Sequence, residues 1–78
     1  TKKRHKIIVF PNPFDDFLFI EGITGNCKIE ILNNWGQILF SKTHSTEYKI
    51  DISNINPGIY YIKIVDITTI RVKKIIKH

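Results

Sequence analysis

The sequence predicts an all-β domain, built as an antiparallel two-sheet sandwich of about seven short strands. The 78 residues include seventeen Ile but no Ala and no Met. β-Branched residues favour strands, whereas Ala is the best helix former. Short apolar runs recur between turn signals at intervals typical of a sandwich. No long stretch repeats its apolar residues at the helical period, so no helix is expected beyond a single turn near residues 53–56.

The first three strands are expected at residues 6–10, 16–21 and 27–32. Pro11 ends the first, because proline cannot donate to a strand ladder, and Gly22 ends the second. The third strand alternates apolar and charged residues, which indicates one buried and one wet face. Its buried face includes the single cysteine, Cys27, which has no partner for an internal disulfide and is expected to act as a small buried hydrophobe.

A tight turn at residues 33–36 is expected to join the third strand to a fourth at residues 37–42. Gly36 suits this turn because glycine adopts positive φ without strain. The fifth strand is expected at residues 47–52, where Tyr48, Ile50 and Ile52 share one face.

The last two strands are expected at residues 59–65 and 70–76, after a corner loop that ends in Pro57 and Gly58. In the first of these, Tyr60 shares the inward face with Ile62 and Ile64. Its hydroxyl then needs a partner near the corner loop, as in the tyrosine corner of immunoglobulin-like sandwiches. If Tyr61 were the more buried of the two tyrosines, this assignment of faces would be wrong.

Alternation along all seven strands yields an expected core. Its members are Val9 or Ile8, Leu18, Ile20, Ile29, Ile31, Ile38, Phe40, Ile50, Ile52, Tyr60, Ile62, Ile64 and Val72.

Charge divides the chain into a basic tail at residues 1–6 and a domain at residues 7–78. Four basic residues lie in the tail and four lie in the last eight residues, whereas residues 7–70 hold four lysines and all seven acidic residues. Basic ends favour anionic partners, although a solubilising fringe is an equally good interpretation. Because the first residue is not Met, we expect the chain to be a piece of a longer protein.

The sequence offers no catalytic, metal or cofactor constellation. His5, His44 and His78 are scattered, with no second ligand at metal-binding spacing. Asp15 and Asp16 form the only acidic pair, which is better suited to a turn than to a calcium site. No nucleophile elbow, no phosphate-binding glycine loop and no apolar stretch long enough to span a bilayer is present. Nucleic-acid binding is not expected, since no aromatic residues are interleaved with the basic ends.

Three motifs occur in order: Val9–Phe14 (VFPNPF), Asn33–Gln37 (NNWGQ) and Ile52–Tyr61 (ISNINPGIYY), followed by the basic end Lys73–Lys77. Together they resemble the C-terminal sorting domain, type A, of proteins exported by the type IX secretion system of Bacteroidota. The resemblance runs from about residue 8 to residue 77. The residues that carry the family motifs are Pro11, Asn12, Pro13, Asn33, Gly36, Gln37, Pro57, Gly58, Tyr60, Lys73 and Lys74.

Each motif also has a structural interpretation. The two prolines stop the first strand, and Asn12 is expected to hydrogen-bond its own backbone across the turn. The final hairpin, Asp66–Thr69, departs from the family because it lacks the Gly or Asn-Gly often found there.

The resemblance implies that the chain is a non-catalytic secretion signal at the end of a cargo protein. It implies recognition by the outer-membrane translocation machinery, passage through the periplasm, and delivery to the cell surface or medium. A surface sortase then commonly removes the domain. Two alternatives remain at this point: an immunoglobulin-like accessory domain that binds carbohydrate or acts as a spacer, and a small module that binds anions or nucleic acid.

Two surfaces are candidates for docking to that machinery. If Leu18 and Ile20 face inward, the strand pleat turns Phe17 and Phe19 outward, and exposed aromatic clusters commonly mark interfaces. The last strand places Arg71, Lys73 and Lys77 on one face. The candidate docking residues are Phe14, Phe17, Phe19, Arg71, Lys73 and Lys77. The alternative is that the phenylalanines are buried on both sides or are covered by the cargo domain.

Overall fold

A computed structural model describes residues 7–23, 26–43 and 49–78 of the chain. Within these residues the fold consists of seven β-strands and no helix. The strands are β1 (Ile8–Phe10), β2 (Phe17–Glu21), β3 (Lys28–Leu32), β4 (Ile38–Thr43), β5 (Lys49–Asp51), β6 (Gly58–Val65) and β7 (Ile70–Lys77). The predicted basic tail at residues 1–6 and the expected strand start at residues 47–48, with Tyr48, lie outside the described residues.

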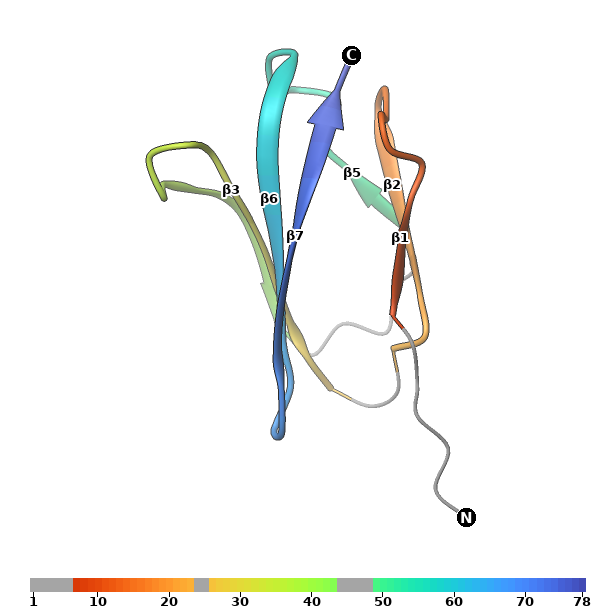
Figure 1. The fold of residues 1–78 in the computed structure, drawn as a ribbon, viewed down its shortest axis with the longest axis vertical. Helices are drawn as coiled ribbons and strands as arrows, with labels where there is room; N and C mark the ends of the chain where they lie inside the picture. The colour runs from red at the N-terminus through yellow and green to blue at the C-terminus, as the bar shows by residue number, and fades with distance from the viewer. Residues whose placement is uncertain (1–6, 24–25, 44–48) are drawn as a thin grey trace.

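The strands form two sheets that face one another as a sandwich (Figure 1). One sheet has three strands in the order β1-β2-β5, and the other has four in the order β4-β3-β6-β7. All pairs of neighbouring strands are antiparallel. The predicted all-β, two-sheet antiparallel sandwich is therefore confirmed.

The core lies between the sheets and is built mainly from isoleucine. Nine of the expected core residues are buried: Leu18, Ile20, Ile29, Ile31, Ile50, Ile52, Tyr60, Ile62 and Ile64. Val9, the better of the two alternatives in β1, and Phe40 are half-buried and pack against them. Cys27 is buried, as predicted for a small hydrophobe.

Two expected core residues, Ile38 and Val72, are instead exposed at 52% and 58%. Ile38 lies outside because the register shifts between Ile31 and Leu32, so Leu32 pairs with Ile38 and Leu39 is left over as a bulge. One extra residue reverses the side-chain alternation. In β7 the buried residues are Ile75 and Lys77, which places Val72 on the outer face of the sheet.

The corner loop before β6 has the predicted tyrosine corner. Tyr60 is buried and its hydroxyl donates to the carbonyl oxygen of Asn56, four residues earlier, while Tyr61 is half-buried. The predicted faces of β6 are therefore confirmed. This hydrogen bond ties the loop to the core strand that follows it.

The turn between β6 and β7 is stabilised by an aspartate and contains no glycine. The Asp66 carboxylate accepts hydrogen bonds from the backbone amides of Thr68 (2.8 Å) and Thr69 (2.7 Å) and from both threonine hydroxyls (3.1 Å each). An aspartate that binds backbone groups ahead of it forms an Asx turn, which explains how this hairpin closes without Gly or Asn-Gly.

This turn predicts an acid dependence of stability. The Thr68 amide, followed by the other three donors, lowers the pKa of Asp66 from its ordinary 3.8 to about 2. A carboxylate whose pKa is lowered by folding stabilises the fold above its unfolded pKa, and this contribution is lost as the pH falls from about 4 to about 2. We expect thermal unfolding to show a smaller fall in Tm across this range for Asp66→Asn than for the wild type. Equal slopes would contradict the assignment.

Candidate functional site: the junction of the Pro-Asn-Pro segment with the last strand

The segment between β1 and β2 crosses from the three-stranded sheet to the free edge of β7. Pro11 and Pro13 lack backbone donors, so Asn12 pairs through its side chain. Its Nδ2 donates to the carbonyl oxygen of Lys74 at 3.1 Å, and its Oδ1 accepts from the amide of Ile76 at 2.9 Å. The expectation that Asn12 would bond its own backbone is wrong, because the strand edge offers both a donor and an acceptor at the right spacing.

Phe14 continues this pairing as a parallel bridge to Lys77. Its amide donates to the carbonyl oxygen of Ile76 at 2.8 Å, and its carbonyl oxygen accepts from the amide of His78 at 2.9 Å. The ring is 1% exposed and belongs to the core. The expectation that Phe14 lies on an exposed docking surface is therefore wrong, because the segment turns this side chain between the sheets.

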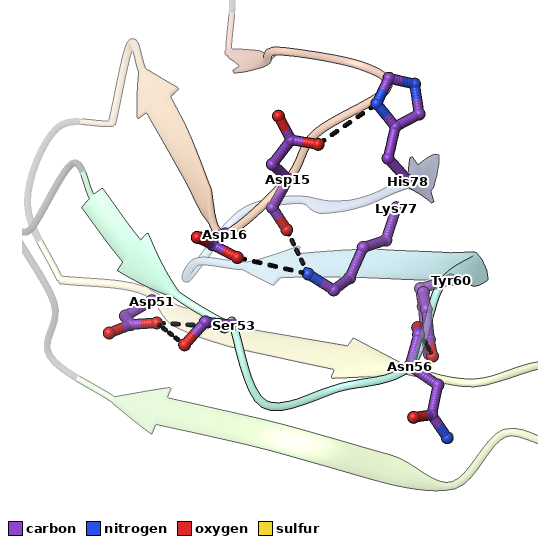
Figure 2. A network of polar contacts seen from close by, with 8 residues as sticks. All are labelled: Asp15, Asp16, Asp51, Ser53, Asn56, Tyr60, Lys77 and His78. Atoms are coloured by element: carbon purple, nitrogen blue, oxygen red, sulfur yellow. Dashed lines mark hydrogen bonds and ion pairs between the residues drawn. The ribbon is translucent and has the colours of Figure 1, made fainter.

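Lys77, at the end of β7, contacts the residues that follow Phe14 at this junction (Figure 2). It is 8% exposed, and its Nζ donates to the carbonyl oxygen of Asp15 and lies 3.8 Å from the Asp16 carboxylate. The same Nζ lies 5.7 Å from the centre of the Phe14 ring. The expectation that Lys77 presents an exposed charge is also wrong. Its ammonium is buried against these partners, which a buried charge needs. Neither the sequence motif nor strand alternation signalled that this lysine is internal.

The carboxylates of the two aspartates at the junction contact the end of the chain, and within the described residues neither makes the turn-capping hydrogen bond that we expected. The Asp16 carbonyl oxygen accepts from the amide of Ile52 at 3.0 Å, and the Asp15 carboxylate lies 3.2 Å from Nδ1 of His78. Nearby, Asp51 caps the next turn by accepting from the amide and hydroxyl of Ser53 (Figure 2). The first two contacts tie the segment before β2 to Ile52 and to the chain end.

Removing the Asn12 amide tests this junction. We expect Asn12→Ala to lower the free energy of unfolding by about 1–3 kcal/mol, because a backbone donor and acceptor on β7 lose their partners. Asn12→Asp keeps an acceptor for Ile76 but places an acceptor oxygen against the Lys74 carbonyl oxygen, so it should also lower the free energy of unfolding. Urea denaturation measures both. An unchanged midpoint for Asn12→Ala would show that water replaces the amide at no cost.

The second motif forms a turn between β3 and β4 that is held by three side-chain hydrogen bonds of Asn33. The Asn33 carboxamide oxygen accepts from the amides of Trp35 (2.9 Å) and Gln37 (3.0 Å), and its Nδ2 donates to Oε1 of Gln37 at 2.9 Å. Gly36 has φ of 79° with open space beside it. Its backbone conformation, and not crowding, requires glycine here. Trp35 at the tip is 89% exposed.

The predicted outward aromatic residues lie on the three-stranded sheet. Phe17 is 37% exposed with Nζ of Lys49 4.1 Å above its ring, and Phe19 is half-buried and stacked on Phe10 at 5.6 Å. The outward orientation of Phe17 and Phe19 is therefore confirmed, since Leu18 and Ile20 are fully buried. Their use as a docking surface stays a prediction.

The basic residues of β7 divide into three environments. Arg71 and Lys73 pair in register with Ile64 and Ile62, so they point to the inner side of the sheet, yet both are exposed. Lys74 lies on the outer face of the sheet and is exposed. With Lys77 buried, the single basic face that we expected along β7 is reduced to Arg71 and Lys73.

The described residues offer little for catalysis. No group of three or more His, Cys, Asp or Glu within them is placed to hold a metal ion. His5 and His44 lie outside the described residues. Burial raises the pKa of the Cys27 thiol, which keeps it protonated and a poor nucleophile at neutral pH. The described part of the chain also contains no helix able to cross a membrane.

The model of a protein family described as the secretion system C-terminal sorting domain matches residues 8–78 of the chain. The chain belongs to this family. The family is that of type IX secretion, so the predicted resemblance is confirmed. The sorting domain is thus a signal for export through that system to the cell surface or medium. A search of curated proteins found no match.

Proposed function

We propose that this sorting domain is a non-catalytic address carried by a cargo protein, and that its folded sandwich is what the outer-membrane machinery reads. The match to the family over residues 8–78 carries the proposal. Further support comes from the junction, in which the first motif pairs with the basic end of the chain in β7. Because β7 is bonded to the segment between β1 and β2, the domain reaches this folded form only when both of its ends are present. A signal that is recognised by its fold would therefore require both ends.

The finer steps belong to the same proposal. The cargo passes through the periplasm, the machinery binds the domain, and a surface sortase then cuts on the N-terminal side of Ile7. A cut there would leave the junction intact, since all its contacts lie between Asn12 and His78. The domain itself supplies no reacting group, in keeping with the protonated thiol of Cys27.

The proposal is tested by fusing residues 1–78 to the C-terminus of a periplasmic reporter in a host that has the type IX machinery. We expect the reporter on the cell surface or in the medium, and in the periplasm of a matched strain that lacks the translocation pore. A fusion ending at Thr69 lacks β7 and provides the control. A reporter that stays in the periplasm in both strains would instead favour an accessory domain that binds carbohydrate or acts as a spacer.

A further inference from the structure

The outer face of the four-stranded sheet is unusually apolar for a surface. The exposed apolar residues of this face are Ile38, which the bulge in β4 turns outward, and Ile59, Ile70, Val72 and Ile76 on β6 and β7. On β7, three apolar side chains point outward, while only Ile75 is an inward apolar side chain fully covered by the core. Extended apolar patches on a soluble domain usually mark an interaction surface.

An open hollow of about 350 Å³ lies in this face. Its walls are Leu32, Tyr61, Val72 and the turn that carries Trp35, and Lys63 lines it as well. Lys63 is half-buried, and its ammonium has no ion-pair or hydrogen-bond partner among residues 7–23, 26–43 and 49–78. Glu30 lies opposite Lys63 in the register, but its carboxylate binds Lys28 at 3.2 Å.

The geometry points to this hollow as the place where a partner protein inserts an acidic side chain flanked by apolar ones. The inference rests on the proposed function and deepens it, because it names the surface that the export machinery reads. An ammonium without a partner in an apolar setting favours an anionic group, and the surrounding apolar side chains favour exclusion of water.

Trp35 is the second anchor of this surface. It lies between Asn34 and Gly36, which both border the hollow, and the hydrogen bonds of Asn33 fix the turn that presents it. Exposed tryptophans held on a rigid backbone bind at low entropic cost and dominate many interfaces.

Charge selects a protein partner over two other occupants. A second copy of the chain would bring Lys63 and Lys74 against like charges on a molecule of net charge +5. A lipid surface gains only a small increment for each lysine, and Lys28 is already paired with Glu30. An acidic, apolar protein surface satisfies both the ammonium and the apolar walls.

The test uses the reporter fusion described above, with variants in this face. We expect Lys63→Gln and Trp35→Ala each to lower the surface-delivered fraction about tenfold or more, since a lost charge partner or a lost central aromatic weakens a fitted interface by at least that factor. Lys63→Arg should retain most delivery. Lys49→Gln on the opposite sheet and Ile67→Ala, in the last hairpin, are the matched controls, and every variant should melt within a few degrees of the wild type.

Each outcome of this experiment supports or overturns the inference. Normal delivery of Lys63→Gln and Trp35→Ala, with the wild type delivered, overturns this inference and leaves the proposed function standing. A loss confined to Lys49→Gln moves the docking surface to Phe17 and overturns it too. A wild-type fusion that stays in the periplasm overturns both proposals. If the wild type floats with vesicles of phosphatidylcholine and phosphatidylglycerol and Lys63→Gln does not, the ligand is lipid and the protein partner is rejected.

Discussion

Phe14→Ala should lower the free energy of unfolding more than the truncation of any other phenylalanine in this domain. Phe14 is 1% exposed and fills the space between the sheets at the junction with β7. Truncating a buried phenylalanine leaves a cavity and costs about 3–5 kcal/mol. Since native domains have about 5–15 kcal/mol of stability in total, this loss is a large fraction of the free energy of unfolding, and the variant should unfold at a much lower urea concentration than the wild type. Urea denaturation followed by circular dichroism measures the loss.

Phe17→Ala is the matched control, three residues along the chain. Phe17 is 37% exposed, and its ring contacts Lys49 on the outer side of the smaller sheet. The same truncation there should cost about 1 kcal/mol or less, as is usual for surface positions. Equal losses for the two variants would show that Phe14 is not the internal member of the pair.

Tyr60→Ala is expected to have the second largest effect, again about 3–5 kcal/mol, because the ring is buried at the start of β6. Tyr60→Phe separates the ring from the hydroxyl. It keeps the packing but leaves the carbonyl oxygen of Asn56 without its donor, so about 1–2 kcal/mol should be lost. Chemical denaturation of both variants checks this. If Tyr60→Phe were as unstable as Tyr60→Ala, the hydroxyl, and not the packing of the ring, would account for the contribution of Tyr60 to stability.

Local alternation was enough to predict the sheets but not every face. The strands begin and end within two residues of prediction where they are described, because Pro11, Gly22 and Gly36 interrupt the apolar runs at the right places. Ile38 was misplaced because a one-residue bulge at Leu39 has no signature in an apolar run. Val72 was misplaced because β7 carries more apolar residues on its outer face than on its inner one.

The junction could not be predicted by the same means. Asn12 and Lys74 are 62 positions apart, and the pairing runs through a side chain of a segment that is not a strand. Neither periodicity nor turn propensity carries that information. The family motif marked the right residues, Pro11 to Pro13 and the basic end, without indicating that they contact one another. It also gave no sign that Lys77 is buried while Lys73 is exposed.

Amide hydrogen exchange of the folded chain tests most directly whether the first motif and the basic end of the chain form one junction. The amides of Phe14, Ile76 and His78 each donate across it, at 2.8, 2.9 and 2.9 Å. We predict that all three exchange far more slowly than free peptides, and that Asn12→Ala speeds exchange at all three while β3 stays protected. Exchange of these amides at free-peptide rates in a wild-type domain with protected β3 would contradict the account.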